Sequence, residues 1–208
     1  ELLEESNSQE LLFFTTLAPF KGLELLLEAF QLLHREYPKL KLTIAGSAHV
    51  RFPNYADELK ARFAGIDGVN WLGQTSEDDV LELFRRAQVV VLPYVASTGS
   101  SSVLYQAATW GRAVVASNLN EIKRLVVESD LQVEFFDSGN ITSLCKSIRK
   151  LIDSKEIRCN QAMHNFNAIQ RTRPHETCQK YIQAFNRALE KRRSPKRIML
   201  PITEQKPA

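Results

Sequence analysis

The chain has 208 residues, of which 44% are hydrophobic, so it is long enough to bury one full-sized core. Its formal charge of +3 comes from 27 basic and 24 acidic residues, and six of the basic residues fall within 191–208 beside a single acidic one. The body is therefore slightly acidic, which argues against a nucleic-acid footprint spread over the fold, so we expect no nucleic-acid partner.

The cysteine and histidine spacings narrow the functional class further. Cys145, Cys159 and Cys178 lie far apart, so the sequence indicates neither a zinc site nor a disulfide framework, and we expect a cytoplasmic protein. The four histidines form no metal-binding spacing, and we predict no metal centre. The sequence has no apolar stretch of about 18 residues. The basic C-terminal tail leaves a peripheral contact with anionic membrane open.

Short β-branched or aromatic runs alternate with helical patterns along the chain. Strands are expected at 11–18, 41–46, 69–73, 89–94, 113–117 and 133–137. Several of these runs are continuously apolar, as strands covered on both faces are. The pattern predicts an α/β fold with a doubly wound, Rossmann-like parallel sheet, in which ligands bind at the carboxyl ends of the strands.

Apolar residues at helical spacing occur between and after these strands. Helices are expected at 23–33, 80–87, 141–152, 155–169 and 174–193. Ser76, with Asp79 three residues later, is typical of a helix N-cap, and Pro174 of a first-turn position. We predict one domain over 1–193 and a mobile basic tail over 194–208.

Turns at two expected strand ends carry residues that suit a ligand. After the first strand, Lys21 stands beside Gly22 at a helix start, where a cation and free N–H groups can clamp a phosphate. After the second strand, Gly46 permits close approach of the backbone to a ligand. A solvated lysine and two plain turn glycines remain the alternative interpretation.

A third turn follows the fourth strand and leads directly into a helix. It contains Gly99 and three consecutive serines, Ser100, Ser101 and Ser102. Together they offer N–H donors, hydroxyls and the positive end of a helix dipole to an anion. The alternative is a simple serine N-cap, for which one serine would suffice.

The common nucleotide and hydrolase motifs are absent. No G-x-G-x-x-G follows the first strand, and no G-x-x-x-x-G-K-[ST], G-x-S-x-G or strand-end D-x-D is present. These absences disfavour a dinucleotide cofactor, an NTPase, a serine hydrolase and a metal-diphosphate site. What remains is a phosphate held by backbone, hydroxyls and one lysine, without a metal.

Four segments occur in an informative order and spacing: LAPFKGLELLLEAFQLL, YPKLKLTIAG, VNWLGQTSEDDVLELFRRAQVVVLPY and SSSVLYQAATWGRAVVAS. With them the chain resembles, over residues 11–153, the C-terminal donor-binding domain of a family 4 (group 1) glycosyltransferase with the GT-B fold. The resemblance implies a nucleotide-diphospho-sugar as donor substrate, no further cofactor, and sugar transfer with retention of configuration. It also implies a preceding N-terminal acceptor domain, which is missing from this chain.

The resemblance also assigns roles to individual positions. It pairs Lys21 with the diphosphate and wraps the N–H groups of 99–102 around the phosphate oxygens. Thr16 stands where the family has an arginine, and Thr98 and Gln106 stand where it has two glutamates that face the donor sugar and the ribose. A hydroxyl or amide cannot stabilise developing positive charge as a carboxylate does, so no catalytic residue is assigned.

Two functional hypotheses therefore stand. The first is the donor-binding half of a retaining glycosyltransferase, inactive by itself, with 72–74 at the edge of the nucleotide base. The second is a non-catalytic GT-B-like module that keeps the fold for nucleotide or partner binding. In the family the last helix crosses back to brace the N-terminal domain, so we expect Ile182, Phe185 and Leu189 to be partly uncovered here or covered by another chain.

Overall fold

The computed structural model describes residues 9–96, 101–171 and 174–193. The chain divides into two compact units, Glu1–Arg171 and Thr172–Ala208. The first unit contains the whole sheet, and the described part of the second is a single helix. The last helix of the predicted domain therefore falls in the second unit, and the predicted tail over 194–208 lies outside the described residues.

Six parallel strands form one sheet in the order β3-β2-β1-β4-β5-β6, which confirms the predicted doubly wound fold. The strands are β1 Glu10–Phe14, β2 Lys41–Ala45, β3 Val69–Gly73, β4 Val89–Leu92, β5 Ala113–Ser117 and β6 Glu134–Phe136. Strands β1 and β4 end earlier than predicted. Beyond β1 the regular ladder gives way to scattered backbone hydrogen bonds and an isolated bridge between Leu17 and Ala48, and Pro93 after β4 has no N–H to donate to the sheet.

The helices follow the strands in turn. They are α1 Leu23–Glu36, α2 Tyr55–Arg62, α3 Glu77–Arg86, α4 Ser102–Thr109, α5 Asn120–Glu128, α6 Ile141–Asp153, α7 Lys155–Gln170 and α8 Pro174–Arg193, with a short 3-10 turn η1 at Pro19–Lys21. Ser76 caps α3 as predicted, accepting a hydrogen bond from the backbone N–H of Asp79. The sequence analysis predicts neither α2 nor α5, because each buries only two apolar side chains.

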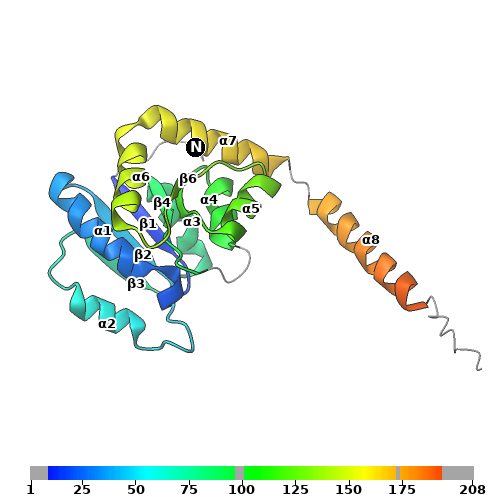
Figure 1. Cartoon of the computed structure of the whole chain (residues 1–208), viewed down its shortest axis with the longest axis horizontal. Helices are drawn as coiled ribbons and strands as arrows, with labels where there is room; N and C mark the ends of the chain where they lie inside the picture. The colour runs from blue at the N-terminus through cyan, green and yellow to red at the C-terminus, as the bar shows by residue number, and fades with distance from the viewer. Residues whose placement is uncertain (1–8, 97–100, 172–173, 194–208) are drawn as a thin grey trace, which may run out of the picture. The chain divides into compact units, whose positions relative to one another are not determined.

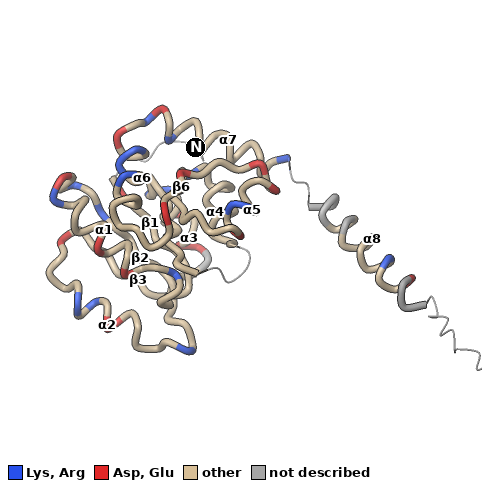
Figure 2. The backbone as a smooth tube through the Cα atoms, viewed as in Figure 1, with Lys and Arg blue, Asp and Glu red and all other residues tan. Residues whose placement is uncertain are grey.

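Helices cover both faces of the sheet (Figure 1). Leu11 and Phe13 of β1 pack in a cluster with α1 and α6, while Leu12 packs in the opposite cluster with α3, α4 and α5. This alternation explains why the strands are apolar at nearly every position. Each fully buried Leu or Phe contributes about 1.5–3 kcal/mol, so the two clusters hold the sheet rigid under its loops. Charged residues lie mostly on helices and loops, away from the strand centres (Figure 2).

At the amino ends of the strands, one buried carboxylate is fully paired. Glu10, at the start of β1, is 2% exposed. It accepts a 2.5 Å hydrogen bond from the Thr43 hydroxyl and hydrogen bonds of 3.1–3.3 Å from the Arg86 guanidinium. These contacts tie β1, β2 and the end of α3 together.

At the carboxyl ends, the loops after β1 and β4 lie side by side. The strand order reverses between these two strands, which is where open α/β sheets bind ligands. The backbone N–H of Val95 donates to the Phe20 carbonyl at 3.1 Å. The two loops therefore form a continuous rim at the switch point.

The second unit contributes one described helix, α8. Within this unit by itself its apolar side chains are exposed: Ile182 by 58%, Phe185 by 67% and Leu189 by 53%. Among the described helices, none is both long and apolar enough to cross a membrane.

Candidate functional site

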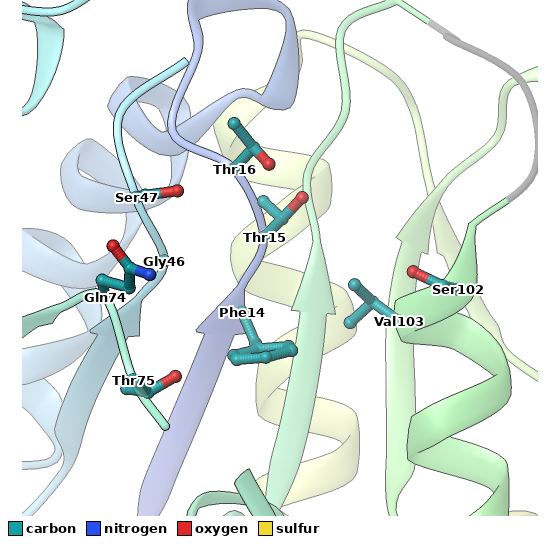
Figure 3. A pocket seen from close by; sticks show the side chains of 9 residues that line it. All are labelled: Phe14, Thr15, Thr16, Gly46, Ser47, Gln74, Thr75, Ser102 and Val103. Carbon is teal, nitrogen blue, oxygen red and sulfur yellow. The ribbon is translucent and has the colours of Figure 1, made fainter. Parts of the chain in front are cut away.

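A pocket of about 270 Å³ opens at the carboxyl edge of the sheet, between the turns after β1, β2 and β3 and the start of α4. Its lining residues are Phe14, Thr15, Thr16, Gly46, Ser47, Gln74, Thr75, Ser102 and Val103 (Figure 3). Figure 3 shows Ser102 and Val103 pointing from the start of α4 towards Phe14 and Thr15. None of the lining side chains is ionisable, so the pocket offers hydroxyl, amide and backbone groups.

The turns after β1 and β2 are held together by their backbones. Thr15 N–H donates to the Ala45 carbonyl at 3.1 Å, and Gly46 N–H donates to the Gly73 carbonyl at 2.7 Å. Gly46 has φ 139°, and a Cβ there would lie 1.9 Å from the Thr15 carbonyl oxygen. Glycine is therefore required at this position by packing alone. The sequence predicts that Gly46 leaves room for a ligand, and Gly46 does lie in the pocket wall.

Lys21 ends the η1 turn, directly before the helix that the sequence predicted there. Gly22 takes φ 71°, and a Cβ on it would lie 1.8 Å from the Pro93 carbonyl oxygen, so this turn is packed tightly on the loop after β4. The Lys21 ammonium lies 4.2 Å from the centre of the Tyr94 ring. Burial lowers the pKa of Lys21, because an apolar surrounding disfavours the charged form. An anion bound beside it would favour the charged form again.

Tyr94 connects Lys21 to the pocket. The side chain is 3% exposed, and burial raises the pKa of its hydroxyl while the neighbouring Ser101 and Thr15 hydroxyls act against that rise. Because Thr15 also lines the pocket, Lys21 lies one aromatic ring away from it, although Lys21 is not itself a lining residue. The sequence analysis did not select Tyr94. Its signal is an aromatic residue directly after Pro93, at the carboxyl end of a buried strand.

The start of α4 contains a buried hydroxyl that the protein does not satisfy. Ser101 occupies the N-cap position and is 4% exposed, yet its side chain makes no capping hydrogen bond. It approaches the Tyr94 hydroxyl without completing a hydrogen bond of ordinary geometry among the described residues. An unsatisfied buried hydroxyl costs about 1–3 kcal/mol, and the missing capping hydrogen bond argues against a role as an ordinary N-cap.

The other predicted site residues divide into three groups. Gly46 and Ser102 line the pocket together with Thr16, the position where the resemblance expects an arginine. Gln106 lies one helical turn after Ser102, and its buried Oε1 accepts no hydrogen bond from the described residues. Three predicted contacts fall outside the described part of the chain: Thr98, Gly99 and Ser100.

The pocket therefore combines neutral hydrogen-bonding groups with one nearby cation. The N-terminus of α4 points N–H groups and a positive dipole end to this edge, and Lys21 adds a charge. Among the residues that the structure describes, no group of three or more His, Cys, Asp or Glu side chains could hold a metal ion. Such an arrangement suits an anion with hydroxyl groups attached.

A known protein family matches most of the first unit. The family model described as "Glycosyl transferases group 1" matches residues 8–154. A phosphatidyl-myo-inositol mannosyltransferase of Propionibacterium freudenreichii is 25% identical over 142 residues, which are 67% of this chain and 34% of that protein. The same-named protein of Mycolicibacterium smegmatis is 29% identical over 113 residues, 54% of this chain and 28% of that protein. The chain thus spans about a third of the length of these curated relatives.

Solved structures share the fold. HepE of Anabaena, in complex with UDP-glucose, superimposes with a TM-score of 0.75 at 22% identity, over 86% of this chain and 49% of that one. The C-terminal domain of a group 1 glycosyl transferase (LpcC) of Francisella tularensis gives a TM-score of 0.67 at 15% identity, over 81% and 87% of the two chains. The architecture is that of the C-terminal half of a GT-B fold.

Proposed function

The chain belongs to the group 1 glycosyltransferase family, and we propose that it is the donor-binding half of a retaining glycosyltransferase. Its ligand is a nucleotide-diphospho-sugar held at the carboxyl edge of the sheet. The observation that carries this proposal is the buried, unsatisfied Ser101 hydroxyl beside a pocket rich in hydrogen-bonding groups, with Lys21 one ring away. The structures of HepE in complex with UDP and with UDP-glucose support the same ligand class.

The proposed roles follow the geometry. The N–H groups at the start of α4 and the hydroxyls of Ser101 and Ser102 hold the diphosphate oxygens. Lys21 supplies the compensating charge across Tyr94. Gln106, whose Oε1 is without a partner in the described structure, accepts a ribose hydroxyl. Gln74, at the far end of the pocket, lies at the edge of the base.

Sugar transfer needs more than this chain contains. The chain spans about half of the HepE chain, and we propose that an acceptor domain on the same longer polypeptide completes the enzyme in the cytoplasm. The fragment alone binds donor without transferring its sugar. The donor is held without a metal or any further cofactor.

A second function, binding without catalysis, has its own support. The pocket lining has no ionisable side chain, and neutral residues occupy the positions where the resemblance expects one arginine and two glutamates. Such a module would keep the nucleotide site and lose the groups that stabilise charge at the sugar carbon.

Calorimetry with nucleotides tests both functions. The chain would be titrated with UDP, GDP and ADP, with the matching nucleosides, and with UDP-glucose. Lys21→Ala would be compared with Lys60→Ala, because Lys60 also lies over an aromatic ring, Trp71, at 5.7 Å, and is not among the residues that line the pocket. We expect Lys21→Ala to weaken diphosphate binding and Lys60→Ala to leave it unchanged. If no nucleoside diphosphate binds, both functions fail; if one binds and the complete polypeptide turns over no sugar, the binding module is correct.

A further inference from the structure

The Tyr94 side chain lies between the two parts of the candidate site. Its ring faces the Lys21 ammonium, which lies 4.2 Å from the ring centre. Its hydroxyl approaches the hydroxyls of Thr15, after β1, and Ser101, at the N-cap of α4. One side chain, 3% exposed, therefore touches the cation with its ring and reaches two of the elements around the pocket with its hydroxyl.

The backbone on both sides of this tyrosine is fixed to the turn that carries Lys21. On one side, a Cβ on Gly22 would lie 1.8 Å from the Pro93 carbonyl oxygen, so the two segments are in close contact. On the other side, the Val95 N–H donates to the Phe20 carbonyl at 3.1 Å. The aromatic ring and the lysine thus belong to one packed unit, although they come from loops after different strands.

This packing gives the ring two physical effects on the lysine. A lysine side chain loses more rotamer freedom on ordering than most side chains do, so one that is already ordered binds a phosphate at a lower entropic cost. The face of an aromatic ring also attracts an ammonium group, and more strongly where water is excluded. Lys21 is half-buried, so the ring replaces part of the hydration that its charge has lost.

We propose that Tyr94 is a positioning residue for Lys21: its ring holds the ammonium in place before the donor enters, so that the lysine meets the diphosphate already ordered. This inference rests on the proposed function, because it needs a diphosphate at the site. It gives the ring a role in affinity as well as in the core. If the ring instead withdrew the lysine from the donor, removing the ring would strengthen binding.

Calorimetry on two variants of the whole chain tests the proposal. Tyr94→Leu removes the ring, and Tyr94→Phe keeps the ring and removes only the hydroxyl. Whichever of UDP, GDP and ADP binds the wild type would be titrated together with its nucleoside. We expect Tyr94→Leu to weaken diphosphate binding by roughly 3- to 30-fold and Tyr94→Phe by less than about twofold. Nucleoside affinity should stay the same in both, whereas a purely structural role would lower both affinities.

Phe20 provides the matched control. Its ring also lies near the Lys21 ammonium, but 5.8 Å separates the ammonium from the Phe20 ring centre. Phe20→Leu should therefore change diphosphate affinity by less than about twofold. In a Lys21→Ala chain, Tyr94→Leu should have no further effect, because a positioning residue acts only through the residue that it positions.

Nuclear magnetic resonance reports the contact without any nucleotide. The ring current of Tyr94 should shift the ε-methylene protons of Lys21 upfield in the wild type and in Tyr94→Phe. The signal is assigned by its absence from Lys21→Ala, and it should return to the ordinary lysine position in Tyr94→Leu. If Tyr94→Leu does not fold, Tyr94→Met takes its place, because methionine also lacks a ring and fills irregular gaps in a core.

Three results would overturn the inference and leave the proposed function intact. They are lysine protons without the upfield shift, a diphosphate affinity that is unchanged or higher without the ring, and an equal loss of affinity in the Lys21→Ala chain. If none of the three nucleoside diphosphates binds the wild type, the proposed function fails and the inference fails with it. Diphosphate binding that depends on the lysine and on the ring, but not on the tyrosine hydroxyl, supports both.

Discussion

The two edges of the sheet treat buried polar groups in opposite ways. At the amino edge, the carboxylate of Glu10 receives hydrogen bonds from Thr43 and Arg86. At the carboxyl edge, the buried Ser101 hydroxyl and the buried Gln106 Oε1 complete no hydrogen bond of ordinary geometry among the described residues. An unsatisfied buried group costs stability, and completion by a ligand is one reason to retain it. The carboxyl edge is therefore where the proposed donor would offset that cost.

One polar atom at the amino edge is also buried and unsatisfied. The buried Oε1 of Gln88, just before β4, also lacks a partner, and it belongs to the amino edge. That atom lies outside the lining of the pocket, and the structure shows no reason for it. The comparison therefore depends on the combination of an unsatisfied atom with an adjacent pocket and a helix N-terminus, which the carboxyl edge alone provides within the described chain.

The largest expected effect is on the amino edge. Arg86→Met leaves the Glu10 carboxylate buried without its cation, which should lower the free energy of unfolding by about 3 kcal/mol. This is the lower end of the usual range, because the Arg86 side chain is 45% exposed and water can partly replace it. Urea denaturation measures the loss, and nucleotide affinity should stay unchanged.

Arg85→Met is the control for that change. Arg85 forms an exposed pair with Glu82 at 3.7 Å, so its loss should cost about 1 kcal/mol or less. Equal stability losses in the two variants would show that the Glu10 network contributes no more to stability than an exposed ion pair does. The hydrogen bonds at the amino edge would then not distinguish it from the carboxyl edge.

The next effect is on binding, at the carboxyl edge. Lys21→Ala should weaken nucleoside diphosphate binding by about 1.5–3 kcal/mol, or roughly 10- to 150-fold, the usual worth of a hydrogen bond to a charged group. The nucleoside without phosphates should bind equally to both proteins. Calorimetry measures the two affinities, and an unchanged diphosphate affinity would remove Lys21 from the site.

The sequence predicted the sheet well because its central strands, such as β4 and β5, are covered on both faces and form nearly continuous apolar runs, and the edge strand β3 still alternates Val69, Trp71 and Gly73 with more exposed residues. Strands β3 and β5 have the predicted bounds, and α8 does too. Helix α2 was missed, because only Tyr55 and Leu59 on it are buried and four of its eight residues are charged. Local patterns reveal continuous burial; they do not reveal a helix that touches the core at two points.

For the candidate site, the sequence pattern indicated polar residues, but it did not indicate which groups pack against them. It chose Gly46 for ligand access, while the structure shows that the Thr15 carbonyl already excludes a side chain there. It omitted Tyr94, because the contact of that ring with Lys21 joins loops from two strands that are far apart in sequence. Contacts across the switch point depend on strand order, which no single motif encodes.

A smaller effect concerns pH. Burial lowers the pKa of Lys21 from its usual value of 10.5, whereas the unfolded chain keeps that value. Between the two pKa values the unfolded state binds more protons, so rising pH should stabilise the folded chain through this residue. Over the same range diphosphate binding should weaken, because it needs the charged lysine. Denaturation and calorimetry across mildly alkaline pH measure the two trends, and Lys21→Met should remove both.

The smallest effect separates a ligand hydroxyl from a helix cap. Ser101→Ala removes a buried oxygen that makes no hydrogen bond, so stability should stay the same or rise slightly, by up to about 1 kcal/mol. Diphosphate affinity should fall by about 0.5–1.5 kcal/mol, because the hydroxyl that the ligand satisfies is gone. Ser117→Ala is the matched control: its hydroxyl is also buried and unsatisfied, but Ser117 is 0% exposed and outside the pocket lining, so affinity should not change. A loss of about 0.5–2 kcal/mol of stability with no change in affinity would return Ser101 to the role of an ordinary N-cap.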